Sequence, residues 1–131
     1  MGPISSAIPT GPSLLRVLVV EDEILIAMEL EMVLTDAGFD VIGPVPVVAA
    51  ALALLKEGRP DAAVLDMNLR GERVTPVAEV LRAMGVPFVL TSAYGAGELA
   101  SDPALADAQN IGKPTNKVAL LGALRGLLKG Q

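Results

Sequence analysis

The chain has neither cysteine nor histidine among its 131 residues. Without cysteine it can form no disulfide and no thiolate metal site, and we expect a cytoplasmic protein, because disulfides are typical of secreted ones. Without histidine it cannot donate a phosphoryl group from an imidazole, use a Ser-His pair or bind zinc through imidazole. Its chemistry must therefore rely on oxygen ligands and on Lys113.

Other scarcities narrow the fold class and the partners. Aromatic residues make up 2% of the chain and apolar residues 52%, and a core of Val, Leu, Ile and Ala favours strands packed between helices over a β-sandwich. The net charge of −5, with no basic run, argues against a nucleic-acid partner. No apolar run reaches the roughly 18 to 20 residues that a membrane span needs. The length accommodates one domain.

Apolar strands and amphipathic helices alternate along most of the chain. Residues 1–13, rich in Pro, Ser and Gly, predict a flexible arm, and residues 14–131 predict one domain with no effector domain after it. The alternation predicts a doubly wound parallel sheet. We expect strands over residues 16–20, 39–43, 61–66, 86–90 and 109–112, and helices over residues 23–37, 47–57, 74–84 and 117–129.

The pattern also predicts local details. Pro44 and Pro46 should end the second strand, residues 68–72 should form a loop, and the segment 94–107 should hold only a short, late or mobile helix because Gly and Pro interrupt it. Thr115 or Asn116 should cap the last helix. The buried stripes are expected to be Ile26, Leu30, Val33 and Ala37 in the first helix and Leu121, Leu124 and Leu128 in the last.

Polar residues follow the predicted strands at one edge of the sheet. Glu21 and Asp22 follow the first strand, Asp66 the third, Ser92 the fourth and Lys113 the fifth. Singly, each has an ordinary interpretation as a helix cap, a strand-end acid, a turn residue or a surface charge. Together they lie at the carboxyl ends of the strands, where open α/β sheets bind ligands. Clustered acids repel one another, so the arrangement predicts a divalent metal site.

From Leu14 to Lys129 the chain resembles the receiver domains of two-component response regulators. The motifs that carry the resemblance are Glu21-Asp22, Asp66 with Asn68 two positions later, Ser92-Ala93 five positions after Pro87, and Lys113-Pro114. The resemblance implies a flavodoxin-like (βα)5 fold with strand order 2-1-3-4-5.

The sequence is most similar to the single-domain receivers of alphaproteobacteria, whose fourth-strand motif reads Phe-Ala-Thr-Gly-Tyr. This chain has Leu-Thr-Ser-Ala-Tyr at residues 90–94 instead. Ser92, rather than Thr91, therefore aligns with the hydroxyl position of the motif.

The resemblance implies a function and assigns roles to residues. Asp66 would accept a phosphoryl group from a sensor histidine kinase or a phosphotransfer protein. Mg²⁺ or Mn²⁺ would be held by Asp22, Asp66 and the backbone carbonyl of Asn68, with Glu21 acting through water. Lys113 and Ser92 would each contact a phosphoryl oxygen. The protein would catalyse only its own phosphorylation and dephosphorylation, so we do not expect an enzyme with a separate substrate.

The resemblance also implies a switch. Many receivers carry an aromatic residue where this chain has Asn110, so we expect Tyr94 to act as the moving ring instead, with Ala93 leaving room beside the site. The Lys113-Pro114 bond is expected to be cis. A downstream protein would bind the face formed by the fourth helix, the fifth strand and the fifth helix.

Two alternatives remain open at this point. The first is a pseudo-receiver that acts as a binding module without phosphorylation, against which the complete set of Asp, Asp, Ser and Lys argues. The second is a flavodoxin-like enzyme that binds a nucleotide or a flavin. That enzyme would need a Gly-rich loop after the first strand, where this chain has acids.

Overall fold

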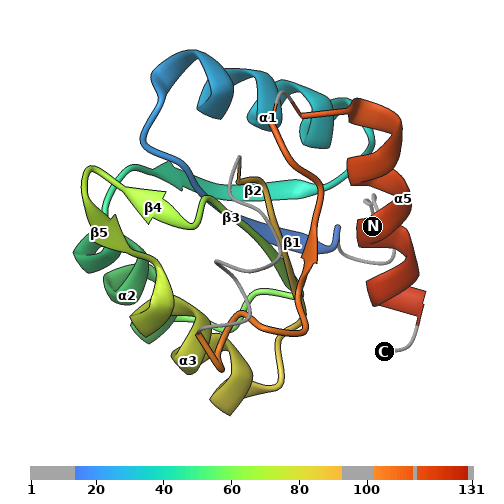
Figure 1. Ribbon diagram of the computed structural model, residues 1–131. Helices are drawn as coiled ribbons and strands as arrows, with labels where there is room; N and C mark the ends of the chain where they lie inside the picture. Colours follow the sequence, from blue (N-terminus) through green and yellow to red (C-terminus); the bar gives the residue numbers. More distant parts are fainter. Residues whose placement is uncertain (1–13, 93–101, 114, 130–131) are drawn as a thin grey trace.

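The computed structural model describes residues 14–92, 102–113 and 115–129. Strand β1 (Arg16–Val20) lies within a five-stranded parallel sheet (Figure 1). The strand order is β2-β1-β3-β6-β7, which is the predicted flavodoxin-like order of the first to fifth sheet strands. A small hairpin of β4 and β5 lies outside this sheet. The remaining elements are β2 (Asp40–Val45), β3 (Ala62–Leu65), β4 (Asn68–Leu69), β5 (Glu72–Arg73), β6 (Phe88–Leu90), β7 (Gln109–Asn110), α1 (Ile24–Asp36), α2 (Val48–Glu57), α3 (Thr75–Met84) and α5 (Lys117–Lys129).

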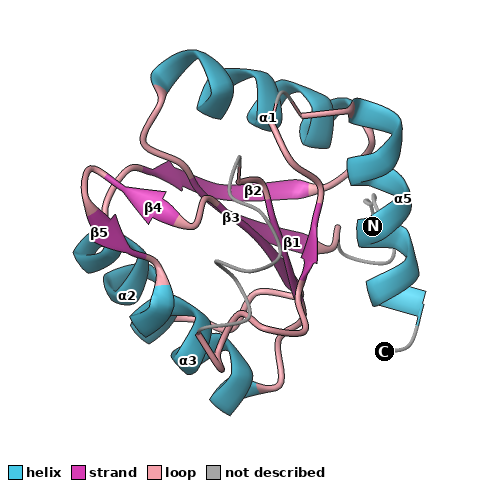
Figure 2. Ribbon diagram, in the orientation of Figure 1, coloured by secondary structure: helices cyan, strands magenta, loops and turns pink. Residues whose placement is uncertain are grey.

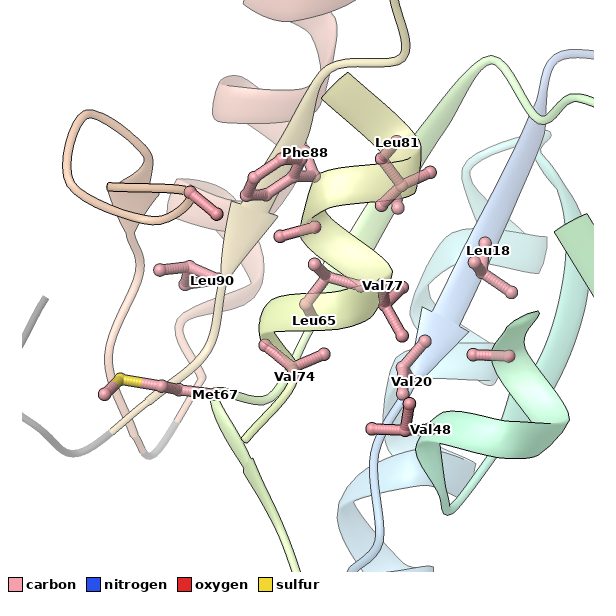
Figure 3. Close-up of a cluster of buried hydrophobic side chains, with 14 of the residues drawn as sticks. Leu18, Val20, Val48, Leu65, Met67, Val74, Val77, Leu81, Phe88 and Leu90 are labelled. Carbon is pink, nitrogen blue, oxygen red and sulfur yellow. The ribbon is translucent and has the colours of Figure 1, made fainter. Parts of the chain in front are cut away.

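Helices cover both faces of the sheet (Figure 2). Alternate residues of a strand point to opposite faces, and β1 shows this directly. Val17 and Val19 pack in a cluster with α1 and α5, whereas Leu18 and Val20 pack in a second cluster with α2 and α3. The second cluster, drawn in Figure 3, also contains Met67, which follows β3. Both faces of the central strands are therefore buried, and their carboxyl ends are the part that opens to solvent.

Helix α1 forms where predicted, and Leu30 of the predicted stripe is buried, whereas Ile26, Val33 and Ala37 are only partly buried. The buried residues are Ala27, Leu30 and Leu34. Apolar residues also cover much of the opposite side of α1, so the helical period alone did not identify every residue that packs on the sheet. The apolar residues on the exposed side are Ile24, Leu25, Met28 and Met32.

Strand β2 does not end at Pro44, contrary to the prediction, but continues to Val45. It is an edge strand, where the missing N–H of proline is tolerated, and its pairing with β1 shifts register between Leu18 and Val20. Gly43 makes this bulge possible. It has a φ of 92°, and a Cβ atom there would lie 3.0 Å from the Val19 carbonyl oxygen. After the shift, the Val45 carbonyl accepts the Glu21 N–H at 3.0 Å, which ties the start of the acidic run to the sheet.

Residues 68–73 form the β4–β5 hairpin rather than the predicted plain loop. Leu69 pairs with Glu72 across the turn residues Arg70 and Gly71, which have φ values of 53° and 85°. Positive φ at both central residues is the geometry of a tight two-residue hairpin, in which Gly is favoured and an Arg is unusual. The hairpin places the Arg70 amide over the carboxyl end of β1.

The described half of the segment before β7 contains turns and no helix between residues 102 and 108. Its fully buried Leu105 packs in the core. Thr75 of α3 donates a hydrogen bond to Asp102, and Arg82 of α3 forms an ion pair with Asp107. These contacts fix the turns against α3 without helical backbone bonding.

Helix α5 begins after Asn116, whose side-chain oxygen accepts the Ala119 N–H at 2.9 Å. The predicted capping residue is therefore Asn116 rather than Thr115. Leu124 is buried as expected, but Leu120 replaces Leu121 as the other fully buried position. Among the described residues, no helix has both the length and the apolar character that crossing a membrane requires.

Candidate functional site

The predicted polar residues meet at the carboxyl edge of the sheet. Val20 and Leu65 are register partners in β1 and β3, so the next residues, Glu21 and Asp66, are neighbours. The Asp66 N–H bonds the Val20 carbonyl at 2.9 Å. The edge is hollowed into a pocket of about 430 Å³, lined by Asp22, Glu23, Asp66, Asn68, Arg70, Gly71, Ser92 and Lys113.

Three carboxylates gather at this edge. Oxygen atoms of Glu21, Asp22 and Asp66 all lie within 4.8 Å of one another. Glu21 and Asp66 are only 2% and 5% exposed, whereas Asp22 is partly exposed. Hard oxygen donors at this spacing suit Mg²⁺. The donor set therefore fits the metal predicted from the sequence.

Lys113 is the cation that faces this cluster. Its Nζ lies 3.1 Å from Asp66 Oδ2, 3.1 Å from Glu23 Oε1 and 3.4 Å from Glu21 Oε1. Burial acts to lower the pKa of Lys113, but hydrogen bonds to Asp66 and Glu23 outweigh burial and raise that pKa. Lys113 therefore stays charged and compensates part of the negative charge.

The three acids differ in protonation behaviour. Burial, strengthened by the charge of Asp66, raises the pKa of Glu21 to about 7. Burial also raises the pKa of Asp66, although Lys113 acts in the opposite direction. The pKa of Asp22 is lowered, because hydrogen bonding, first of all from the Arg70 N–H to Oδ2 at 3.0 Å, outweighs the effect of its burial. Asp22 is therefore the acid of this cluster that most readily carries full charge.

Ser92 lines the pocket, and Thr91 does not. The Thr91 side chain is fully buried and its hydroxyl has no hydrogen-bond partner among the described residues. Asn68 lines the pocket from β4, and its N–H lies 3.4 Å from Asp66 Oδ1. This placement agrees with the choice of Ser92 over Thr91, whereas any contact of Ser92 with a phosphoryl group stays a prediction.

The structure brings together Glu21, Asp22, Asp66, Asn68, Ser92 and Lys113. The predicted switch residues Ala93 and Tyr94 lie outside the described residues, as does the Lys113-Pro114 bond, because Pro114 is not described.

Two participants at this site did not emerge from sequence reasoning. Glu23 belongs to the acidic run that was noted, but nothing in the run indicated that Glu23 would pair with Lys113 at 3.1 Å. The Arg70 amide reaches Asp22 only because the hairpin turns over the pocket. The Arg-Gly pair was the available signal, since Gly at the second turn position favours a tight hairpin.

Comparisons with known proteins agree on one family. Residues 17–125 match the response regulator receiver domain family. The chain is 43% identical over 81 residues to the DNA-binding response regulator MtrA of Mycolicibacterium paratuberculosis, in a match that covers 60% of this chain and 35% of MtrA. The chain thus spans about a third of the length of the curated relatives of this kind.

Solved structures are similar over nearly the whole described fold. A crystal structure of a response regulator receiver protein from Sinorhizobium medicae has a TM-score of 0.79 and 32% identity, covering 88% of this chain and 95% of that chain. The solution structure of SdrG from Sphingomonas melonis has a TM-score of 0.73 and 43% identity, covering 88% of this chain and 97% of that chain.

Proposed function

We propose, from the premise that this chain belongs to the response regulator receiver domain family, that it accepts a phosphoryl group on Asp66 in a Mg²⁺-dependent reaction. The observation that carries the proposal is the Asp66 carboxylate, held 3.1 Å from Lys113 Nζ in a pocket beside two further acids. The donor would be a sensor histidine kinase or a phosphotransfer protein of a two-component system.

The proposed reaction transfers the phosphoryl group from a donor histidine to Asp66. A carboxylate oxygen of Asp66 forms a bond to phosphorus while the phosphorus–nitrogen bond breaks, and the electron pair of that bond stays on the imidazole. The product is an acyl phosphate. Such a transfer needs alignment and charge neutralisation rather than a covalent helper. The protein catalyses no reaction on a separate substrate in this proposal.

The residues around Asp66 would supply this alignment. Asp22, Asp66 and the Asn68 carbonyl would hold Mg²⁺ or Mn²⁺, with Glu21 acting through water, and the ion would neutralise phosphoryl oxygens. Lys113 already contacts Asp66 and would shift part of its contact to the incoming phosphoryl group. The Ser92 hydroxyl would donate a hydrogen bond to another oxygen.

We expect one phosphoryl group to be added when the purified protein is incubated with Mg²⁺ and acetyl phosphate. Intact mass spectrometry would measure the adduct, and fragmentation should place it on the peptide that contains Asp66. A matched sample with a chelator should stay unmodified, because without the ion the acids repel the donor. The proposal would be contradicted by an absent adduct, by an adduct on another residue, or by one that forms equally well in chelator.

The exposed side of α1 supports a protein donor. Asp66 is only 5% exposed, so a donor histidine must enter the pocket mouth, and the donor must cover the rim where α1 begins. From that rim runs an apolar surface of Ile24, Leu25, Met28 and Met32, exposed by 60% to 80%. Exposed apolar surface of this kind marks interaction sites. We propose that the donor protein rests on this surface.

Leu25→Glu and Met28→Glu should therefore slow phosphorylation by the donor protein about tenfold or more, since each places a charge in an apolar contact. Phosphorylation by acetyl phosphate should be unchanged in both variants. The matched control is Ala53→Glu, which adds the same charge at an exposed position of α2 on the other face of the sheet. Equal slowing with both donors, or in the control, would rule out this docking surface.

We also propose that the chain acts as a stand-alone regulator of the alphaproteobacterial single-domain type. The support is the similarity to SdrG, whose chain is matched over 97% of its length. Signal output would then pass to a protein partner through the face that contains β7 and α5. A pseudo-receiver remains the alternative, and the phosphorylation experiment separates the two.

A further inference from the structure

Asn110 ends β7 at the point where the two last sheet strands separate. Leu90 and Asn110 are register partners, and the Ile111 N–H still bonds the Leu90 carbonyl at 2.7 Å. Gly112 then turns the chain away with a φ of 86°. Ser92 is only 2% exposed, and buried backbone N–H and C=O groups are almost always hydrogen-bonded. Because the neighbouring strand has turned away at this point, the Ser92 backbone groups must bond to something else.

The Asn110 carboxamide provides those partners. Its Oδ1 accepts the Ser92 N–H at 3.0 Å, and its Nδ2 donates to the Ser92 carbonyl at 3.1 Å. The two bonds form a ring in which a side chain replaces a strand neighbour. Oδ1 also accepts the Gly112 N–H at 3.0 Å. One side chain thus holds the backbone of Ser92 and the residue directly before Lys113.

We propose that Asn110 is a positioning residue, which fixes the Ser92 hydroxyl and the Lys113 amine in the pocket that they line together with Asp66. This inference rests on the proposed function. Its physical basis is that misplacing a group by about 1 Å near a reacting centre can slow a reaction about a hundredfold. Asn110 is well placed to prevent such misplacement, because the bonds that it makes lie on both segments that carry the two groups.

The chemistry requires an amide at this position. The side chain must accept two N–H groups and donate to one carbonyl, which an aspartate cannot do because an ionised carboxylate only accepts. Asn110→Asp would keep both acceptor contacts but place negative charge against the Ser92 carbonyl oxygen, now 3.1 Å from Nδ2. Asn110→Ala would remove the three bonds described above. The two variants therefore remove different parts of the contact.

The first measurement is the phosphorylation rate with acetyl phosphate at saturating Mg²⁺. We expect Asn110→Ala to be slowed about tenfold or more, Asn110→Asp to be slowed less, and Mg²⁺ affinity to change less than about twofold because Asn110 lies outside the acidic cluster. The exposed neighbour Gln109→Ala serves as the control and should behave as wild type. If the wild type is phosphorylated and Asn110→Ala is equally fast, the positioning role is wrong.

A double-mutant cycle separates positioning from a general effect on folding. Because Asn110 holds both Ser92 and Gly112, the double variant Asn110→Ala with Ser92→Ala should be slowed by clearly less than the product of the two single effects. Slowing equal to that product would show that Asn110 does not act through Ser92 and would overturn the inference. Because Asn110→Ala could be poorly folded, the same cycle is run with Asn110→Asp, and thermal melting of each variant identifies any loss of stability.

Hydrogen exchange tests the contact without phosphorylation. The Ser92 and Gly112 amides should exchange faster in Asn110→Ala than in the wild type, whereas the Asp66 amide, bonded to Val20, should not change. Unchanged exchange at both amides would refute the contact and the inference with it. An unphosphorylated wild type would instead contradict the proposed function, so the two failures are distinguishable.

Discussion

Asp66→Asn is expected to abolish phosphorylation by acetyl phosphate and by a protein donor alike. The carboxamide that replaces the carboxylate is almost the same size, but it is a poor nucleophile and cannot form an acyl phosphate. Lys113 would keep its contacts with Glu23 and Glu21, so the pocket should retain its shape. Intact mass after incubation with Mg²⁺ and donor would show the unmodified protein alone.

The structure suggests a matched control for this experiment. Asp36→Asn makes the same chemical change at an exposed position at the end of α1 that lies away from the pocket, and it should be phosphorylated like the wild type. The free energy of unfolding should change by no more than about 0.5 kcal/mol for the exposed Asp36→Asn. Asp66→Asn should also leave the fold intact, because it removes an unfavourable burial of charge together with the ion pair and leaves Lys113 paired with Glu21 and Glu23. Retained phosphorylation in Asp66→Asn would contradict the assignment of the phosphoacceptor.

The sequence allowed the sheet and the convergence of the site to be predicted for one physical reason. A short apolar run that ends in an acid, as at Val20-Glu21 and Leu65-Asp66, describes a parallel strand that is buried on both faces and open at its carboxyl end. Once two such strands are neighbours, their acids must be close. Burial of Val20 and Leu65 at 1% and 0% exposure bears out this pattern.

Other features depend on contacts that periodicity does not encode. The packing face of α1 was ambiguous because Leu25 and Met28 make its exposed side apolar as well. The extent of β2 depended on the bulge at Gly43 and on the position of β2 at the edge of the sheet. Together these outweigh the tendency of proline to end a strand. Such choices are decided by tertiary packing, which outweighs local preference.

Asn110 illustrates the same limit within the site. In the sequence it marked only the absence of a familiar aromatic residue. In the structure its side chain bonds both backbone groups of Ser92. The geometry that creates this contact, two strands that pair for two residues and then diverge at Gly112, becomes visible only when both strands are placed.

Removal of the Asp22 charge should have the largest effect on metal binding. Glu21 and Asp66 both have raised pKa values and share Lys113, whereas the pKa of Asp22 is lowered. A unit charge about 4 Å from another is worth about 4 kcal/mol at an effective dielectric constant of about 20. The cost of removing water from the ion offsets much of this attraction. Even so, Asp22→Asn should weaken Mg²⁺ binding about tenfold or more.

Calorimetric titration of Mg²⁺ into the wild type, Asp22→Asn, Glu21→Gln and Asp36→Asn would measure the four affinities. We expect the loss of Mg²⁺ affinity to be largest for Asp22→Asn and absent for Asp36→Asn. It should be smaller for Glu21→Gln, because Glu21 is buried and its charge is partly compensated by Lys113. Phosphorylation of Asp22→Asn at low Mg²⁺ should fall in parallel and recover in part as the Mg²⁺ concentration is raised, because Asp66, the proposed nucleophile, is intact. Equal affinities in the wild type and Asp22→Asn would show that the acidic cluster is not the metal site, whatever the rate of phosphorylation.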